Sequence, residues 1–276
     1  MPTRGPSGND QIHLIPLETP VSKLFSFRVH VALVDGLLID TGFRHARSRF
    51  FRAIAGRRVE QAVNTHAHED HSGNNLALLE RLAVRLHAPA AALPALSRPW
   101  VDTRHLYQRV IWGLPEPSAP EPLASEIGTD RFTFRLIPTP GHSLDHVCLF
   151  EPDQGWLFAG DLYLGTRVKL ARPYENGIDL IASLELVAEL EPRVLVCYHR
   201  GVVEEPVNAL QRKLEWLRQL RDRVLQLHGR GAAPAAIARR LLGPDPSPLR
   251  LLTGGDVSSA NLVRSFLKAP GEGYEY

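Results

Sequence analysis

The stretch NTHAHEDHSGN, residues 64–74, places His66, His68, Glu69, Asp70 and His71 within six positions. A solvated loop has no need of three imidazole groups, and a packed core has to give each ring nitrogen a hydrogen-bond partner. Imidazole nitrogen and carboxylate oxygen are ligands that zinc, iron and similar metals accept. The stretch therefore indicates a metal site.

The local pattern predicts how these residues are arranged. QAVNTH (61–66) is typical of a strand, and SGNNLALLERL (72–82) predicts a helix that a small polar residue opens. Alternate residues at a strand end point to the same side, which puts His66 and His68 together. A sharp turn after them aims Asp70 and His71 at a second metal nearby.

Three further ligands follow predicted strands later in the chain. His142 lies in IPTPGHSLDH, Asp161 in LFAGDLYLG and His199 in LVCYHRG. Strand ends converge on one edge of a layered sheet, so these positions can meet the first cluster. Structural zinc sites are usually built from cysteine, and Cys148 and Cys197 lie elsewhere, so the cluster favours catalysis.

The order of predicted elements indicates a layered α/β fold. Strands and helices alternate up to residue 199. From there the pattern becomes helical, with an apolar stripe along residues 207–227. We expect a catalytic domain over residues 12–203 and a helical C-terminal extension over residues 204–276 that packs on it.

The segment from residue 97 to 130 is a long insertion rich in proline, with Trp100, Tyr107 and Trp112. Long insertions of this kind are often lids or binding loops. A simple surface excursion is the alternative, and the sequence does not decide between them. Its apolar and aromatic character suits an acyl chain.

Composition excludes some classes of function. The 276 residues are 44% hydrophobic and carry a net charge of +2, which gives no basic footprint for nucleic acid. No apolar run approaches the roughly 20 residues of a membrane span, and the polar start MPTRGPSGND, expected to be frayed, lacks the core of a signal peptide. Both cysteines lie in apolar runs and are expected as buried thiols, which fits a cytoplasmic protein. We expect a small-molecule substrate, and a homodimer is compatible with the sequence.

The sequence resembles the metallo-β-lactamase superfamily. That family is marked by H-x-H-x-D-H, here HAHEDH (66–71), followed at a distance by His, Asp and His, here His142, Asp161 and His199. LIDTG (38–42) is similar to an early turn of that fold. The resemblance covers roughly residues 12–203. It implies a four-layer αββα sandwich, with the metals at one edge.

The resemblance also implies how the ligands are shared between two divalent ions, expected to be Zn²⁺, with Mn²⁺ or Fe²⁺ as alternatives. His66, His68 and His142 would bind the first ion, and Asp70, His71 and His199 the second, with Asp161 bridging both. Asp40, in the LIDTG turn, would orient a ligand histidine. A hydroxide held between the ions would attack the substrate, and Asp70 would also handle the proton.

Several activities share this ligand set. True β-lactamases of the superfamily generally carry Cys or Ser where Asp161 stands, so we expect an ester-type bond as substrate, with thioester favoured, lactone next and a β-lactam only as a side activity. The ligand set with Asp161 is similar to that of the glyoxalase II-like branch. The alternative is a phosphoester hydrolase: a phosphodiesterase, a phosphotriesterase or a nuclease. An iron-dependent persulfide dioxygenase, a flavin-linked diiron oxidoreductase and a non-catalytic scaffold fit the complete ligand set less well.

Supporting residues are less clearly marked. Tyr163 is a candidate hydrogen-bond donor to a substrate oxyanion or a packed side chain, and Tyr107, Trp112 and Arg200 are further candidate substrate contacts. Arg172 and Lys169 lie near site loops, where solvated charge is favoured over a role in binding. Asp145 and His146 are expected to pack or to support ligands. Glu69 is expected at a helix start or on the surface.

Overall fold

The structure is a computed structural model that describes residues 11–25, 27–98, 106–246 and 251–274. The expectation of a frayed start at residues 1–10, and Trp100 of the insertion, lie outside the described residues.

Two six-stranded mixed sheets form the body of the molecule. The first sheet has the order β1-β2-β3-β4-β5-β6, antiparallel as far as β3 and parallel from β3 to β6. Its strands are β1 (His13–Leu17), β2 (Val29–Val34), β3 (Leu37–Ile39), β4 (Gln61–Val63), β5 (Arg85–Ala88) and β6 (Glu121–Pro122). The turn between β2 and β3 has positive φ at Asp35 and Gly36, as an Asp-Gly hairpin turn requires.

The second sheet has the order β12-β11-β10-β9-β8-β7 and is antiparallel except between β10 and β11. Its strands are β7 (Glu126–Gly128), β8 (Thr133–Pro138), β9 (Val147–Glu151), β10 (Trp156–Phe158), β11 (Val194–Cys197) and β12 (Gly201–Val203). The parallel pair needs a crossover, and α7 (Gly177–Ala188) supplies it.

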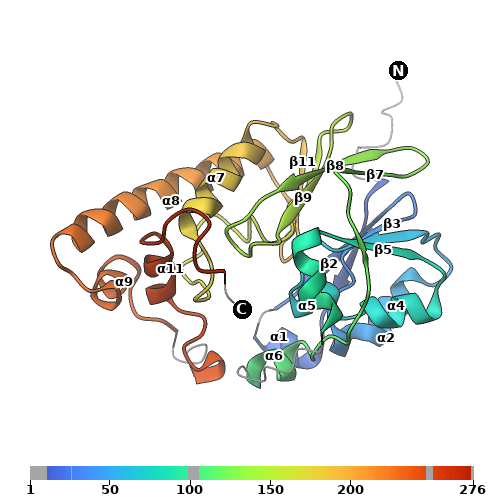
Figure 1. Ribbon diagram of the computed structural model, residues 1–276, viewed down its shortest axis with the longest axis horizontal. Helices are drawn as coiled ribbons and strands as arrows, with labels where there is room; N and C mark the ends of the chain where they lie inside the picture. The colour runs from blue at the N-terminus through green and yellow to red at the C-terminus, as the bar shows by residue number, and fades with distance from the viewer. Residues whose placement is uncertain (1–10, 26, 99–105, 247–250, 275–276) are drawn as a thin grey trace, which may run out of the picture.

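The two sheets pack face to face between two helical layers (Figure 1). Val34 and Val63 of the first sheet share one buried cluster with Phe134 and Phe158 of the second. On the outer face of the first sheet, α2 (Arg47–Ile54) packs Phe50 and Ile54 inward, and α4 (Asn75–Arg81) packs Leu78. The outer face of the second sheet is covered by α7 and by α8 (Pro206–Gly229). The αββα sandwich expected from the sequence is confirmed.

Further helices lie along the described chain. They are α1 (Pro20–Leu24), η2 (Arg44–Ala46), α3 (Glu69–Ser72), η3 (Ala90–Ala92), α5 (Leu93–Ser97), α6 (Leu106–Ile111), α9 (Pro234–Leu242) and α11 (Ser259–Ser265). Among the described helices, we find none with both the length and the apolar character needed to cross a lipid bilayer.

A C-terminal helical region is present and shares its core with the second sheet. Leu210, Leu214 and Leu217 of α8 lie in the same buried cluster as Leu157 of β10 and Phe266, which follows α11. The boundary at residue 204 stays a prediction.

Within the insertion, residues 106–130 are built into both sheets. Its β6 pairs with β5, and its β7 pairs with β8. After α6, Trp112 is 4% exposed, with its ring centroid 5.0 Å from that of Phe43. Tyr107 is 5% exposed and lies in the same cluster.

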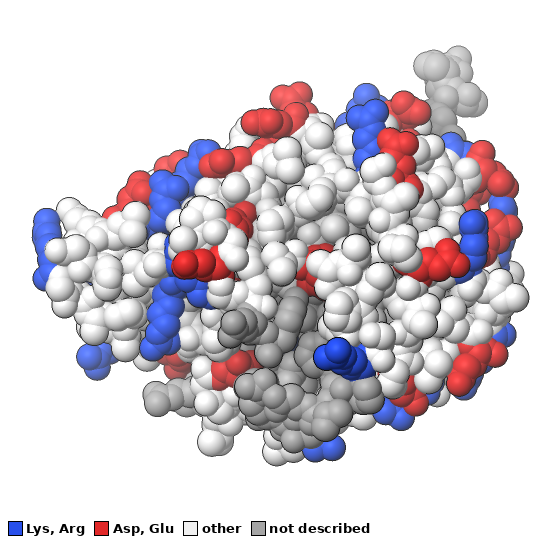
Figure 2. Space-filling view, viewed as in Figure 1, with Lys and Arg blue, Asp and Glu red and all other residues white. Residues whose placement is uncertain are grey.

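The surface carries no large patch of a single charge on the face that Figure 2 shows. Lys and Arg side chains alternate there with Asp and Glu around the rim. Many of the described cations are paired, for example Arg58 with Asp35, Glu60 and Asp130.

Candidate metal centre

Seven side chains converge at the ends of four strands. His66, His68, Asp70 and His71 follow β4, His142 lies between β8 and β9, Asp161 follows β10, and His199 follows β11. Their ligand atoms form two groups, each with all of its atoms within 4.8 Å of one another. The first group is His66, His68 and His142, and the second is Asp70, His71, Asp161 and His199.

In the first group, three ring nitrogens face one point. His66 Nε2 lies 2.8 Å from His68 Nδ1, and His142 Nε2 lies 3.0 Å from the same atom. Burial, assisted by the neighbouring histidines and Arg172, lowers the pKa of His66 and His68 well below the ordinary value. Neutral imidazole is the form that binds a metal.

In the second group, carboxylates and imidazoles alternate. Asp70 Oδ2 lies 3.3 Å from His199 Nε2, and Asp161 Oδ1 lies 3.4 Å from His71 Nε2. Asp161 Oδ2 lies 3.4 Å from His199 Nε2 and also 3.4 Å from His142 Nε2. Asp161 is therefore in contact with both groups.

Two observations fit a divalent cation at this place. His71 Nε2 and Asp161 Oδ1 are buried and have no hydrogen-bond partner, although buried polar atoms are nearly always paired. Burial opposes a charged His71, yet Asp40, Asp161 and Asp70 raise its pKa to about 10, so positive charge is favoured here. The nitrogen and oxygen donor set suits zinc, manganese or iron.

Asp40 holds His71 in place from the end of β3. Its Oδ2 lies 2.8 Å from His71 Nδ1, and its Oδ1 accepts the backbone N–H of Thr65 at 2.8 Å. With Nδ1 engaged by a carboxylate, His71 Nε2 is left facing Asp161, which is the usual arrangement behind a ligand histidine. Asp40 adopts a positive φ of 61°, which turns its side chain back under the site.

A network of amides fixes the turn that carries the first four ligands. Asn75 donates to Asn64 Oδ1 at 2.7 Å, and Asn64 donates to the His71 carbonyl at 3.2 Å. Thr41 donates to that carbonyl too, at 3.1 Å. The turn between residues 64 and 75 is therefore closed on itself by buried hydrogen bonds.

Asp145 and His146 both bond to backbone groups beside ligands. Asp145 Oδ2 accepts the N–H of Ala67 at 2.8 Å, and His146 Nε2 accepts the N–H of Asp161 at 3.0 Å. Gly160 makes the second contact feasible. Its φ is 46°, and a Cβ there would lie 2.6 Å from His146 Nε2.

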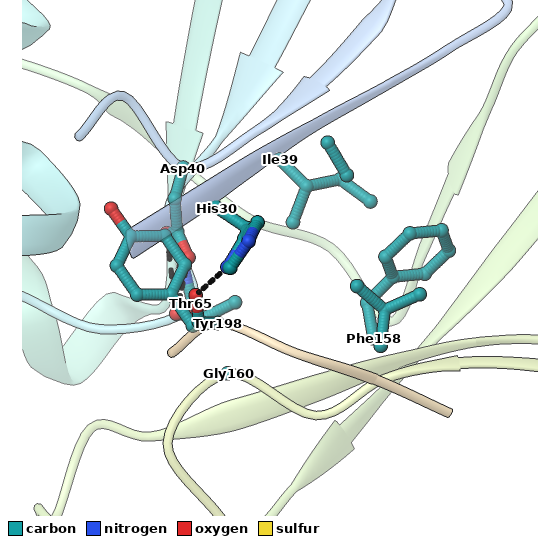
Figure 3. Close-up of a pocket in the computed structure, with 9 residues that line it drawn as sticks. His30, Ile39, Asp40, Thr65, Phe158, Gly160 and Tyr198 are labelled. Carbon is teal, nitrogen blue, oxygen red and sulfur yellow. Dashed lines mark hydrogen bonds between the residues drawn. The ribbon is translucent and has the colours of Figure 1, made fainter. Parts of the chain in front are cut away.

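Beneath the site, a small cavity lies between the two sheets (Figure 3). Asp40 and Thr65 line it from the first sheet, and Gly160 and Tyr198 from the second. His30 faces Tyr198, with its Nδ1 3.0 Å from the Tyr198 carbonyl. The Tyr198 ring stacks on His71 at 3.6 Å between centroids, and its hydroxyl donates to the Asp70 carbonyl.

Sequence reasoning missed Tyr174 and the contacts that join it to Arg172 and Glu69. Tyr174 Oη lies 2.9 Å from His68 Nε2, the nitrogen that faces away from the first group. Arg172 donates to Tyr174 Oη at 2.6 Å and forms an ion pair with Glu69 at 3.5 Å. Tyr174 stands in an irregular loop, so no periodicity marked it.

Of the two positions expected for Glu69, a helix start or the surface, the structure has the helix start: Glu69 begins α3, and it is 1% exposed and faces Arg172. The expectation for Arg172 is wrong. The Arg172 side chain is 14% exposed and engaged, where a solvated charge was expected.

The candidate substrate contacts lie around the site but stay predictions. Tyr163 is 6% exposed and its hydroxyl lies 3.2 Å from Thr166 Oγ1. The Tyr107 hydroxyl donates to Asp256 at 3.0 Å, and the Trp112 ring lies 6.4 Å from His199. Arg200 is exposed and donates to the Leu164 carbonyl. Lys169 is exposed, as expected.

Comparison with known proteins is consistent with this geometry. Residues 28–214 match the family model described as the Metallo-beta-lactamase superfamily. A Beta-lactamase-like protein 2 homolog of Drosophila melanogaster is 32% identical over 107 residues, which cover 38% of this chain and 35% of that protein. The Acyl-coenzyme A thioesterase MBLAC2 of Gallus gallus is 32% identical over 197 residues, 61% of this chain and 70% of that protein.

The first two curated relatives are matched over only part of their length, 35% and 57%. Among solved structures, a metallo-beta-lactamase family protein from Thermus thermophilus superposes with a TM-score of 0.64. The superposition covers 94% of this chain and 92% of that one at 20% sequence identity.

Proposed function

The chain belongs to the metallo-beta-lactamase superfamily, and on that premise we propose that it is a dinuclear metal hydrolase whose substrate is a thioester. The proposed ligands are His66, His68 and His142 for one ion, and Asp70, His71 and His199 for the other, with Asp161 shared. A small molecule, not nucleic acid, is the proposed substrate class.

The position of Asp161 carries the dinuclear part of the proposal. Its Oδ2 lies 3.4 Å from a histidine of each group, so one carboxylate can serve two ions. Histidine nitrogen predominates among the donors, which favours zinc over the harder manganese.

Two divalent ions bound there would lower the pKa of a water molecule and polarise the substrate carbonyl. Residues of the chain transfer the proton and orient the ligand histidines. Asp70, 4% exposed, accepts the proton of the attacking water and returns it to the leaving thiolate. Asp40 and Tyr174 hold His71 and His68 in orientation from behind.

Two observations support a thioester over a phosphoester of nucleic acid. The chicken relative named an acyl-coenzyme A thioesterase shares 32% identity with this chain. On the face shown in Figure 2, cationic and anionic side chains are interspersed, which gives a polyanion no continuous basic surface. A lactone is the next candidate, because its ester carbonyl presents the same electrophile.

Initial hydrolysis rates on a matched panel test the proposal. The panel holds an acyl thioester, a long-chain lactone, an aryl phosphodiester, a phosphotriester and a β-lactam, each run with the zinc-loaded protein. We expect the thioester to have the highest kcat/KM. Asp70→Ala should lower that value by about 10²–10⁴-fold, the usual contribution of a proton-transfer group.

Asp222→Ala is the matched control, because that carboxylate lies 65% exposed on α8. It should leave the rates unchanged, and circular dichroism should show all three proteins folded. Full turnover by Asp70→Ala would contradict the proposed mechanism, and a preference for a phosphoester would contradict the proposed substrate.

Metal analysis of the protein as purified separates hydrolysis from oxidation. Two zinc-like ions per chain are expected. One iron per chain, with oxygen consumption on a persulfide, would instead indicate a dioxygenase.

A further inference from the structure

Each candidate ligand histidine has one ring nitrogen that faces its ligand group and an outer nitrogen that faces away from it. A neutral imidazole that binds a metal through the first nitrogen carries its proton on the outer one. A hydrogen-bond acceptor for that outer N–H fixes the tautomer and the orientation of the ring. The partner of each outer nitrogen therefore matters for metal binding.

Four of the five outer nitrogens contact an oxygen atom. The two described above, on His68 and His71, lie against a hydroxyl and a carboxylate. His66 Nδ1 lies 3.1 Å from Thr65 Oγ1, and His199 Nδ1 lies 2.9 Å from the backbone carbonyl of Arg28.

His142 is the exception. Its Nδ1 is buried, and within the part of the chain that the structure describes it has no hydrogen-bond partner. The carboxylate oxygen Oε2 of Glu175 lies 3.8 Å away, which is too far for a direct hydrogen bond. Buried polar atoms are nearly always paired, either with protein or with ordered water.

Glu175 is anchored by its other oxygen and by its backbone. Its Oε1 accepts the backbone N–H of Arg172 at 2.9 Å, and its own N–H donates to the Arg172 carbonyl at 3.2 Å. The Glu175 carbonyl accepts the ammonium of Lys268 at 2.8 Å. The carboxylate is therefore held beside His142 without closing the remaining gap.

A small cavity touches both residues. Its polar lining consists of His142, Glu175, Asp161 and Lys213, and it leaves about 20 Å³ for the centre of a water molecule. One buried water needs roughly 10–15 Å³ of such space and two to four polar partners. Lys213 donates to two backbone carbonyls of the loop after Asp161, and an ammonium has three N–H groups. Both the size and the lining of the cavity suit one water molecule.

We propose that one water molecule in this cavity joins His142 Nδ1 to Glu175, and that Glu175 is the residue that positions His142. The water accepts the Nδ1–H and donates to Glu175 Oε2. His142 is thereby held with Nε2 unprotonated, on the side that faces Asp161. The inference rests on the ligand role proposed for His142 and is independent of which bond is hydrolysed.

Glu175→Gln tests the positioning role with little change of shape. The single amide oxygen of glutamine can keep the hydrogen bond from Arg172, which leaves the NH₂ group on the side of His142. The water then receives a proton from the wrong side, and the Nδ1–H of His142 loses its acceptor. Affinity for the first ion should fall about 10–100-fold, with the second ion unaffected, as measured by competition with a chromophoric chelator.

Nuclear magnetic resonance of the zinc-loaded protein, labelled in its histidines, gives a readout that general loosening would not reproduce. The Nδ1–H signal of His142, identified by its loss in His142→Ala, should lie downfield and exchange slowly with solvent. In Glu175→Gln it should move upfield and exchange faster, while the signals of the other ligand histidines stay in place. Glu189→Gln is the matched control, because that glutamate is exposed at the end of α7, and it should change neither the signal nor the affinity.

An unchanged His142 signal in Glu175→Gln, or an equal loss of affinity for both ions, would overturn the positioning role. A crystal structure of the zinc-loaded protein checks the bridge, and a direct contact between Nδ1 and Oε2 would overturn it.

Neither measurement uses a substrate, so this inference and the proposed function fail separately. The expected changes in Glu175→Gln, in a protein that hydrolyses no thioester, would support the inference and contradict the thioesterase. Thioester hydrolysis with an unchanged His142 signal would do the reverse. Absence of metal binding by the unaltered protein would contradict both.

Discussion

Asp161 shows how much of the centre depends on single residues. Its backbone N–H donates to His146, while its carboxylate oxygens lie 3.4 Å from His71, His142 and His199. Gly160, directly before it, takes a positive φ of 46° that brings the chain against His146. One residue is therefore held by its backbone and leaves its whole carboxylate free for ligation.

Among the hydroxyl groups that contact a ligand histidine, we expect that of Tyr174 to contribute most to metal affinity. Tyr174→Phe removes the hydrogen bond to His68 Nε2, at 2.9 Å, and leaves the ring in its place. Because such partners orient ligand histidines, metal affinity should fall about 10–100-fold. Competition with a chromophoric chelator measures it.

Tyr163→Phe is the matched control, since that hydroxyl contacts Thr166 and no candidate ligand. It should leave the affinity unchanged. If Tyr174→Phe binds metal as tightly as the unaltered protein, the packing of His68 alone fixes its ring, and the role of Tyr174 is refuted.

At the scale of elements, the sequence predicted what short-range patterns encode. The order of strands and helices up to residue 199 predicted the layered fold, and the residue types of the ligand turn predicted the metal site. The helix expected over residues 72–82 is α4, which begins at Asn75, and Gly73 and Asn74 separate it from α3. A Cβ at Gly73 would lie 2.6 Å from the backbone nitrogen of Arg44, a contact that no local pattern reveals.

Elements and contacts that exist only through tertiary pairing were not predicted. The two-residue strand β6 forms because β5 pairs with it. Tyr174 contacts His68 from an irregular loop, and Arg172 contacts Tyr174, so their role follows from the fold and not from spacing.

Lys213 ties α8 to the loop after Asp161, and its burial gives a pH-dependent prediction. Burial, opposed in part by Cys197, Glu175 and Asp161, lowers the pKa of Lys213 from 10.5 to about 8. Between those values the unfolded chain binds a proton that the folded chain does not, so the free energy of unfolding rises with pH there. Across that pH range the free energy of unfolding should rise by about 3 kcal/mol from this group.

Lys213→Met should remove this contribution. The difference in unfolding free energy between the unaltered protein and the variant should grow by about 3 kcal/mol from pH 8 to 10.5, measured by urea unfolding after metal removal. Lys23→Met, at a side chain 71% exposed, should show the same pH dependence of the unfolding free energy as the unaltered protein. If the unfolding free energies of Lys213→Met and the unaltered protein changed in parallel with pH, Lys213 would stay protonated in the folded protein.

At the scale of the whole molecule, we expect the described chain to unfold as one cooperative unit, because the helices after residue 204 share a core with the second sheet. Leu210 of α8 is fully buried in the cluster that contains Leu157 of β10. Leu217 of α8 and Leu262 of α11 lie in the same cluster. A region whose apolar residues lie in this shared core has no separate core of its own.

Unfolding by urea should therefore show a single transition, with far-UV circular dichroism, which follows the helices, coinciding with tryptophan fluorescence. Leu210→Ala should shift the whole transition and lower the unfolding free energy by about 2–5 kcal/mol, because it leaves a cavity at the joint between α8 and the sheet. Leu225→Ala, at a position 46% exposed on the same helix, should change it by no more than about 0.5 kcal/mol. Two separate transitions, of which Leu210→Ala moves only the helical one, would instead make residues 204–276 an independent domain.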